Sequence, residues 1–411
     1  MGSLAGLLMC LTGMFALQGC AGLAVSESGS SDERPPAAVL PMTIRTLNTE
    51  HRFTQIPTAA VAQQLHALHV GEPLNILAIS GGGSGGAFGA GAVAGLTRSG
   101  SRPDFALVTG VSAGALVAPY AFLGATWDSR LLGAFTGEAA DNLLQARGLG
   151  AIFGSSLYRG TPLKHLVEAY VSDSMIEAVS REVDRGRLLL VATTDVASGQ
   201  PVVWDLGSIA RNGGPSARAL FCDVLVASAS VPGMFPPVII RLQDGGAHQE
   251  AHVDGAATVP FFVPAAFVQA PSEAFGRAHA AAVYVIIDGP LAEAARTTRL
   301  TARGVLSRSI DAGLNHLLLA TLELTAATAQ LQGATLHYSA VPAAYPYLDA
   351  FDFRAVTRRP LFRYAYECAQ KGRLWAEIRR TDNDEGTAGR AQLQKVPCPS
   401  DDPFIGYFAT R

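Results

Sequence analysis

A serine flanked by glycines, in the run Gly110-Val111-Ser112-Ala113-Gly114, is the first feature of this sequence that could do chemistry. One apolar stretch, 105–109, precedes it and a second follows, so a strand and then a helix are expected on either side. That is the setting of a nucleophile elbow, in which small neighbours let the backbone turn sharply and the serine Oγ projects from the sheet. Ser112 is therefore a candidate nucleophile. The alternative is a serine that caps a helix after an ordinary tight turn.

A glycine-rich loop, Gly81-Gly82-Gly83-Ser84-Gly85-Gly86, follows the apolar stretch 74–80 and precedes a helix expected over 87–98. Exposed backbone N–H groups in such a loop can bind an anion. One interpretation is a dinucleotide fingerprint, which needs an acidic residue at the end of the second strand, whereas Asp104 precedes that strand. The other is an oxyanion hole, and the position of the loop shortly before the serine elbow favours it.

A carboxylate could complete the site. Asp254 follows a short apolar stretch and precedes the small residues Gly255 and Ala256. If this tight turn brought its carboxylate to Ser112, Asp254 could act as the general base directly. Taken alone, Asp-Gly is typical of an ordinary turn.

Histidines offer a different way to activate the serine. A Ser-acid-His triad in the order of the α/β-hydrolases needs a histidine after Asp254. The histidines there are His279, His316 and His337, and none lies in a loop with obvious turn chemistry. His248 and His252 precede Asp254 and are expected on the surface of a Gly-rich hairpin.

Strands and helices alternate along the chain, which predicts an α/β fold with a mostly parallel sheet. Strands are expected over residues 74–80, 105–109, 187–194, 202–205, 281–288 and 336–340. Helices are expected over residues 87–98, from 113 to about 123, and over 161–185, 215–229 and 303–332. Residues 360–380 mix aromatic and cationic side chains, and predict either a basic amphipathic helix that touches lipid or a helix packed on the core.

The composition excludes several classes of protein. The chain has 411 residues, a formal net charge of −3 and only 16% charged residues. A disordered chain would be richer in charge, and a nucleic-acid-binding protein would carry a basic excess, so neither is expected. Residues 105–127 contain no charged side chain and could span a membrane, but their glycines and proline favour a strand, turn and helix in an α/β core.

The N-terminus has the pattern of an export signal. Residues 4–17 are almost wholly apolar and lead to Leu17-Gln18-Gly19-Cys20, which resembles the lipobox of bacterial lipoproteins. That resemblance implies cleavage before Cys20, lipidation of its thiol, and a membrane-anchored exported protein. Ala21 in place of Asp favours the outer membrane. The departure is the absence of Lys or Arg before Cys20.

In an oxidising compartment Cys368 and Cys398 could pair, and no cysteine spacing indicates a metal site.

The glycine loop, the serine elbow and Asp254-Gly255-Ala256, in this order, resemble the patatin-like phospholipase family. The run of small residues and prolines at 227–237 resembles the stretch before the family's aspartate. The resemblance covers about residues 74–264. It implies a three-layer α/β/α fold, a Ser-Asp dyad without histidine, and hydrolysis of acyl esters such as phospholipids or lysophospholipids, with no cofactor or metal. It assigns Ser112 as nucleophile and Asp254 as base.

The same resemblance assigns the oxyanion hole to the N–H groups of Gly82, Gly83 and Ser84. Supporting positions in the three motifs are Gly81, Gly85, Gly86, Gly110, Gly114, Gly255 and Ala256. Many family members carry Arg or Lys where this chain has Gly85, so a cation that could bind phosphate is missing. This departure weakens the expectation of a phospholipid substrate more than that of ester hydrolysis.

The sequence thus predicts five segments: a signal peptide at 1–19, a tether at 20–45, a lead-in at 46–73, an acyl-hydrolase domain at 74–290 and a C-terminal extension at 291–411 packed on the core. The expected activity is that of a serine acyl-ester hydrolase, of the phospholipase A or lysophospholipase kind. The alternatives are a histidine-dependent esterase and a membrane lipoprotein without enzymatic activity.

Overall fold

The structure is a computed structural model of the chain. It describes residues 42–69, 74–148, 154–242, 249–269, 281–291, 300–342, 345–346 and 349–377. The expected signal peptide, Cys20, His248, His279 and Cys398 lie outside these residues, so the expectations about them are not addressed by the structure.

A single sheet forms the centre of the described structure. Five neighbouring strands at its middle are parallel: β10 (Thr335–Val341), β9 (Ala282–Pro290), β3 (Asn75–Ile79), β4 (Leu107–Val111) and β5 (Leu188–Asp195). The edges add β11 (Ala376–Glu377) beside β10, and β6 (Pro201–Asp205), β1 (Thr43–Leu47) and β2 (Phe53–Pro57) beyond β5. The hairpin of β7 (Val238–Arg241) and β8 (Gln249–Asp254) joins the carboxyl end of β5.

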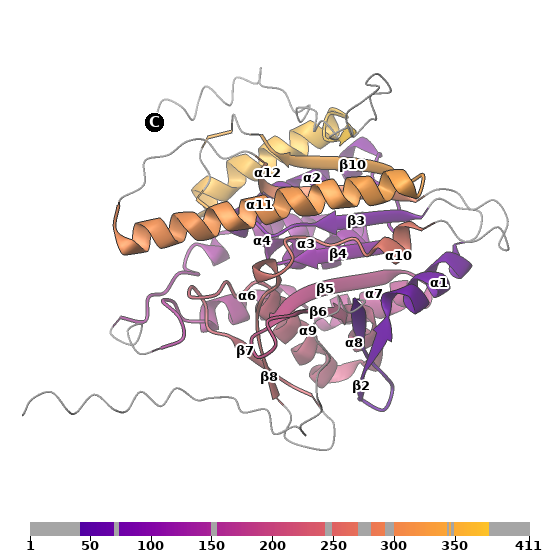
Figure 1. The fold of residues 1–411 in the computed structure, drawn as a ribbon, viewed down its shortest axis with the longest axis horizontal. Coiled ribbons are helices and arrows are strands. Elements are labelled where there is room, and N and C mark those ends of the chain that lie inside the picture. Colours follow the sequence, from indigo (N-terminus) through magenta and orange to yellow (C-terminus); the bar gives the residue numbers. More distant parts are fainter. Residues whose placement is uncertain are drawn as a thin grey trace, which may run out of the picture.

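Helices cover both faces of this sheet, so the expected three-layer α/β/α arrangement is confirmed (Figure 1). One face carries α1 (Thr58–Leu68), α10 (Ala265–Val268) and α11 (Ala302–Leu331). The other carries α2 (Gly86–Ser99), α3 (Ala113–Leu123), α4 (Asp128–Thr136), α6 (Thr161–Tyr170), α7 (Asp173–Asp184), α8 (Leu206–Asn212), α9 (Gly214–Ser228) and α12 (Ala355–Gln370). Short 3₁₀ turns occupy Gly83–Gly85, Ala125–Trp127, Glu138–Ala140 and Gly255–Ala257.

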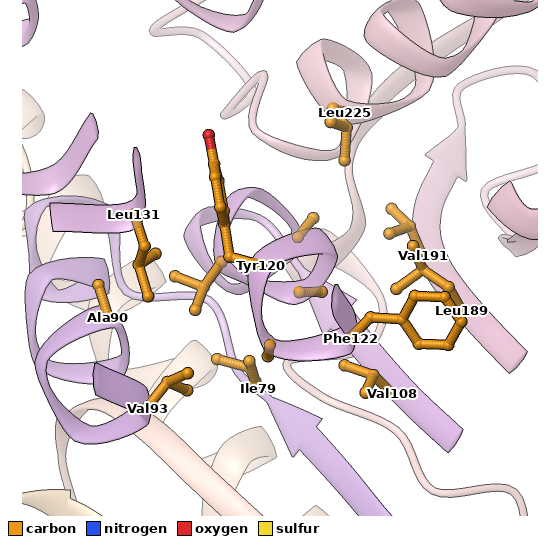
Figure 2. Packing of buried hydrophobic residues seen from close by; sticks show 14 of the residues in the cluster. Ile79, Ala90, Val93, Val108, Tyr120, Phe122, Leu131, Leu189, Val191 and Leu225 are labelled. Carbon is orange, nitrogen blue, oxygen red and sulfur yellow. The ribbon is translucent and has the colours of Figure 1, made fainter. Parts of the chain in front are cut away.

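The strand that carries the candidate serine is buried on both sides. Every residue of β4 and of β5 is buried, as expected for parallel strands between two helical layers. Helix α3 packs directly on them, with Phe122 beside Val108 and Leu189 (Figure 2). A helix anchored in this way holds the preceding turn, which contains Ser112, in a fixed position.

The predicted helix over 161–185 is in fact two helices. α6 ends at Tyr170 and α7 begins at Asp173. Ser172 is the N-cap of α7, and its Oγ accepts the N–H of Met175 at 3.3 Å. Apolar periodicity continued across this break, but a serine followed by an aspartate is a helix-start signal that should have been given more weight.

The predicted helix over 360–380 was also placed wrongly, because α12 begins at Ala355 and ends at Gln370. Pro360 lies inside α12, and Trp375 lies beyond it. Leu361 and Phe362 are buried in the same core as α2, so α12 is a packed helix of the C-terminal extension.

One further boundary differs from expectation. Strand β1 begins at Thr43, so residues 43–45, which were expected to belong to a flexible tether, are part of the sheet. Residues 105–127 contain β4, the elbow and α3, as the α/β-core interpretation expected. Among the helices that the structure describes, none combines the length and the apolar character needed to cross a bilayer.

Candidate active site

The register of the sheet brings Ser112 and Asp254 together. β4 ends at Val111, which pairs with Ala192 of β5, and the next residue of β5, Thr193, pairs with Asp254 of β8. β8 therefore lies in line with β4, just beyond its end. Because Ser112 directly follows Val111, its side chain meets the carboxylate of Asp254, and Ser112 Oγ donates a hydrogen bond to Asp254 Oδ2 at 2.5 Å.

The backbone at Ser112 has the geometry of a nucleophile elbow. Its φ of 55° and ψ of −124° lie where side chains rarely occur, and such strain is typical of functional sites. The flanking residues must be glycines, because backbone atoms of neighbouring segments lie too close to leave room for a Cβ. A Cβ on Gly110 would lie 2.6 Å from the carbonyl oxygen of Gly114, and one on Gly114 would lie 2.4 Å from that of Ile79. The expected roles of Gly110 and Gly114 thus have a steric basis.

Ser112 is held from its backbone as well. Its N–H donates to Ser228 Oγ at 2.9 Å, and Ser228 Oγ in turn donates to the carbonyl oxygen of Ala192 at 2.7 Å. Ser228 lies in the small-residue stretch that was singled out in the sequence. The stretch therefore packs against the elbow and fixes the direction of the serine.

Asp254 is buried, with 2% of its surface exposed. Its Oδ1 accepts the N–H of Ala256 at 2.8 Å, and Oδ2 accepts Ser112 Oγ. Burial raises the pKa of Asp254 to about 7, although the hydrogen bonds from Ser112 and Ala256 act to lower it. A carboxyl with a pKa near neutrality is matched to general-base catalysis. A Cβ on Gly255 would lie 2.4 Å from the carbonyl oxygen of Ala192, so the turn after Asp254 also requires glycine.

The glycine loop lies against the serine, at the carboxyl end of β3. A Cβ on Gly81 would lie 3.1 Å from Ser112 Cβ, and Gly83 lines the same pocket as Ser112. None of the described residues accepts the N–H of Gly82 or of Gly83. These two groups are therefore available for an oxyanion, and the position of the loop beside Ser112 favours this interpretation over a dinucleotide site.

Ser84 was also expected to donate to the oxyanion, but in this structure its N–H is engaged. It donates to the carbonyl oxygen of Ala350 at 2.8 Å, and Ser84 Oγ donates to that of Asp349 at 2.8 Å. The expectation for Ser84 is therefore corrected, since a donor already paired with a backbone acceptor does not serve an oxyanion. No feature of the sequence indicated that a segment so far along the chain would reach the loop.

A second buried carboxyl lies on the other side of the glycine loop. Asp288 of β9 accepts the N–H of Gly89 at 2.8 Å, and its own N–H donates to Ser80 Oγ at 3.0 Å. Burial raises the pKa of Asp288 well above its usual range. Its carbonyl oxygen would lie 2.1 Å from a Cβ on Gly82. The sequence signal was an aspartate at the end of an apolar strand, and its relation to the loop became visible only with the strand order.

His252, expected on a hairpin surface, is fully buried. Its Nε2 lies 2.9 Å from Glu250 Oε2 and its Nδ1 lies 3.0 Å from Thr193 Oγ1. Arg45 completes this cluster with two hydrogen bonds to the Glu250 carboxylate, at 2.5 and 3.1 Å. Since Ser112 Oγ bonds Asp254 directly, and both His252 nitrogens face other partners, the described structure places no histidine between serine and aspartate.

This cluster predicts an acid-dependent contribution to stability. Burial alone would raise the pKa of Glu250, but hydrogen bonds from His252 and Arg45 outweigh it and hold the pKa at about 2. Because this value lies below the ordinary 4.5, Glu250 stabilises the fold above about pH 4.5, and the contribution is lost as the pH falls towards 2. We expect Glu250→Gln to reduce the free energy of unfolding by about 2 to 3 kcal/mol at pH 7.

More than half of that difference should disappear by pH 3, as measured by urea unfolding of both proteins at each pH. Glu177→Gln, on the exposed surface of α7, is the control and should change little at either pH. A difference between Glu250→Gln and the parent that stays constant from pH 7 to pH 3 would contradict the assignment.

An apolar pocket opens at Ser112. Its empty space is about 950 Å³, including the open space at its mouth. Helices α3 and α6 contribute four lining residues each. The lining residues are Gly83, Ser84, Ser112, Ala113, Leu116, Pro119, Tyr120, Ala134, Phe135, Ala140, Leu143, Leu163, Leu166, Val167, Tyr170, Val171, Met175, Leu225, Ala229, Val231, Phe235, Phe351, Phe353 and Arg358.

Within the part of the chain that the structure describes, no three or more His, Cys, Asp or Glu side chains gather where they could hold a metal ion. The groups assembled at the pocket are instead a serine, a carboxylate and free backbone N–H donors. This arrangement is suited to nucleophilic acyl transfer.

Part of the chain is similar to known proteins. Residues 77–266 match the family model described as patatin-like phospholipase. No curated protein sequence matches the chain. Among solved structures, VipD from Legionella pneumophila is similar with a TM-score of 0.33 and 10% identity, over 81% of this chain and 72% of VipD. Human GIVD cytosolic phospholipase A2 is similar with a TM-score of 0.32 and 12% identity, over 71% of this chain and 52% of the human one.

Proposed function

We propose that the chain, whose residues 77–266 match the patatin-like phospholipase model, is a lipid acyl hydrolase that works through a dyad of Ser112 and Asp254. The observation that carries this proposal is the direct hydrogen bond from Ser112 Oγ to Asp254 Oδ2 at a strained elbow. Nucleophile and base within hydrogen-bond reach, with the base oriented by a third group, are the usual signature of covalent catalysis. Here the N–H of Ala256 orients the base.

In the first step Ser112 Oγ attacks the ester carbonyl carbon, and its proton passes to Asp254. The carbonyl oxygen becomes an oxyanion, which the N–H groups of Gly82 and Gly83 stabilise. Collapse of this intermediate expels the alcohol, which takes the proton from Asp254, and leaves the acyl group on Ser112.

In the second step water replaces the alcohol. Asp254 accepts a proton from the water, whose oxygen attacks the acyl-enzyme, and the same N–H groups hold the second oxyanion. The fatty acid then leaves as Ser112 regains its proton from Asp254. No group other than substrate and water is consumed.

The substrate that we propose is an ester of a fatty acid, with its acyl chain in the apolar pocket. Phospholipids and lysophospholipids are the first candidates because of the family. Gly85 is buried and supplies no cation, and the charged residue of the pocket, Arg358, is engaged with protein groups. Phosphate recognition by the loop is therefore not expected, and neutral acyl esters should be hydrolysed as well.

The pKa of Asp254 predicts the pH profile. The base must be ionised, and its pKa of about 7 means that kcat/KM should rise with pH and approach its plateau above pH 8. Below pH 7 the rate should fall about ten-fold per pH unit, so that at pH 5 it is about 100-fold below the plateau. Initial rates on p-nitrophenyl butyrate between pH 5 and 9 measure this. A profile that is flat from pH 5 to 8 would contradict Asp254 as the base.

The test of the proposed function is a hydrolysis panel with a reactive-serine probe. Phosphatidylcholine, lysophosphatidylcholine, triglyceride and p-nitrophenyl esters are offered to the protein, and a fluorophosphonate probe is mapped by peptide mass spectrometry. We expect release of fatty acid and a label on Ser112. No hydrolysis and no label would favour a lipoprotein without enzymatic activity. Hydrolysis that depends on a histidine would favour the esterase alternative.

We also propose that the protein is exported and held at a membrane by lipid on Cys20, most simply at the outer membrane. The lipobox-like run ending at Cys20 supports this. Expression in a bacterial host with and without Cys20→Ala tests it. The parent should sediment with the membrane and the variant should not, and equal partition of the two would reject the anchor.

A further inference from the structure

Part of the pocket wall is formed by residues that lie outside the domain matched by the family model. Three of the described lining residues, Phe351, Phe353 and Arg358, lie beyond residue 266, and all three fall within residues 349–358. We call residues 349–358 the C-terminal strap. Phe351 and Phe353 are only partly buried, as expected for side chains that face an open pocket.

One end of the strap is bonded to the glycine loop. The carbonyl oxygen of Ala350 accepts the N–H of Ser84, and that of Asp349 accepts its hydroxyl, each at 2.8 Å. The contact is tight, because a Cβ on Gly83 would lie 2.1 Å from the carbonyl oxygen of Ala350. The two phenylalanines therefore stand at a fixed place relative to the loop beside Ser112.

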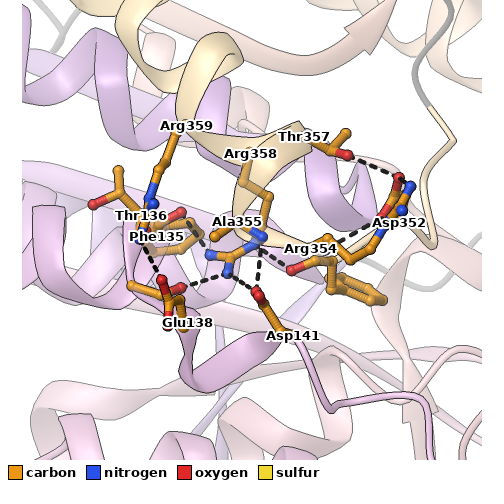
Figure 3. A network of polar contacts seen from close by, with 12 residues as sticks. Phe135, Thr136, Glu138, Asp141, Asp352, Arg354, Ala355, Thr357, Arg358 and Arg359 are labelled. Carbon is orange, nitrogen blue, oxygen red and sulfur yellow. Dashed lines mark hydrogen bonds and ion pairs between the residues drawn. The ribbon is translucent and has the colours of Figure 1, made fainter.

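The other end of the strap is bonded to the pocket rim formed by α4 and the turn after it. The Arg358 guanidinium donates to the carbonyl oxygens of Phe135 and Gly137 at 2.6 Å each, and to that of Phe353 in the strap itself at 2.6 Å (Figure 3). It also pairs with Asp141 at 3.2 Å, and the Arg358 side chain is only 4% exposed.

Within the strap, Asp352 accepts two hydrogen bonds from the Arg354 guanidinium, at 2.7 and 2.6 Å, and one from Thr357 at 2.7 Å. The N–H of Ala355 donates to Asp141 at 2.7 Å. Asp352, which lies between the two phenylalanines, is thus bonded to residues at the start of α12. The strap is thus a rigid wall with both ends fixed.

We propose that Phe351 and Phe353 determine which acyl chains the enzyme accepts. This inference rests on the proposed function, since it assigns the acyl chain to the pocket at Ser112. Two aromatic rings on a fixed wall limit the space beyond the reacting carbonyl. Arg358 acts as a positioning residue, because its hydrogen bonds join the strap at Phe353 to the pocket rim at Phe135 and Gly137.

The test is a chain-length series of p-nitrophenyl esters from acetate to palmitate, with kcat/KM measured for each. Phe351→Ala and Phe353→Ala enlarge the pocket and should move the optimum to longer chains, while Phe353→Trp should move it to shorter ones. We expect the ratio of kcat/KM for long to short esters to change by at least about ten-fold, in opposite directions for Ala and Trp, because contacts with a few methylenes change.

Val356→Ala is the matched control, because Val356 lies in the same strap with 69% of its surface exposed and does not line the pocket. It should keep the parental profile. Arg358→Lys keeps the charge but loses the fork that reaches three carbonyl oxygens, so it should flatten the chain-length preference.

The outcomes separate the two proposals. Suppose that the parent hydrolyses the series and that each phenylalanine variant changes kcat/KM by the same factor for every chain length. The phenylalanines then have only a structural role, and the inference fails. If the parent hydrolyses none of the esters, the proposed function fails first. Should a variant unfold, single-turnover labelling of the remaining variants by alkyl phosphonates of graded length gives the same comparison.

Discussion

Asp254→Asn is expected to lower kcat for acyl-ester hydrolysis by about 10⁴-fold, the size of the loss when a serine hydrolase loses a member of its catalytic set. Asparagine has nearly the same shape and can still accept the N–H of Ala256 and contact Ser112 Oγ. It cannot accept the proton of Ser112, so the serine stays a weak nucleophile. The measurement is kcat on p-nitrophenyl butyrate, with Ser112→Ala as the reference for complete loss.

The same variant should be more stable than the parent at neutral and alkaline pH, which rules out misfolding as the cause of the loss. The pKa of Asp254 is about 7 in the folded state and 3.8 ordinarily, so the folded state binds this proton more tightly. The contribution of the Asp254 carboxyl to the free energy of unfolding is fully present below about pH 4, and it is lost as the pH rises through 7. Replacing the carboxyl should therefore add up to about 4 kcal/mol at pH 8.

At pH 4 the two proteins should unfold at similar denaturant concentrations. His316→Ala and His337→Ala should keep most of the activity, since neither histidine contacts the Ser112–Asp254 pair in the described structure. An active Asp254→Asn protein, or the loss of activity in one folded histidine variant, would overturn the dyad.

The sequence carried enough information for the centre of the fold, because local signals and topology agree there. The stretches that became β3, β4 and β5 are short apolar runs followed by glycines or a turn, a pattern typical of parallel strands buried on both faces. Apolar periodicity could not find the break between α6 and α7, because the apolar face continues across Ser172. Helix ends are set by caps, and these are weaker signals than periodicity.

At the site, too, the residues set by local sequence signals could be predicted and those set by distant contacts could not. Ser112, Gly110 and Gly114 were predictable because strain at an elbow requires small neighbours in adjacent positions. Asp254 was predictable only through its place in a motif. The burial of His252, the engagement of Ser84 by Ala350 and the pocket wall at Phe351 depend on contacts between residues far apart in the chain. Such contacts follow from strand order and leave no periodic pattern in the sequence.

Gly82→Ala is the second change for which we expect a large effect, a fall in kcat of about 10² to 10³-fold, the usual loss when an oxyanion donor is removed. The added Cβ would lie 2.1 Å from the carbonyl oxygen of Asp288 and 2.7 Å from its Cβ. The nearest of these atoms belongs to the backbone of a central strand, so it is the loop that must move. A displacement of about 1 Å is enough to lose such a factor.

Gly289→Ala is the matched control, because it adds the same methyl beside Asp288 where no atom lies within 4 Å. The kinetic signature separates a lost oxyanion donor from a blocked pocket. Gly82 does not line the pocket, and most lining residues belong to other elements, so KM for a long acyl ester should change little in Gly82→Ala while kcat falls. A rise in KM with unchanged kcat would mean that Gly82 only shapes the entrance, and the N–H groups of the loop would then not be the oxyanion hole.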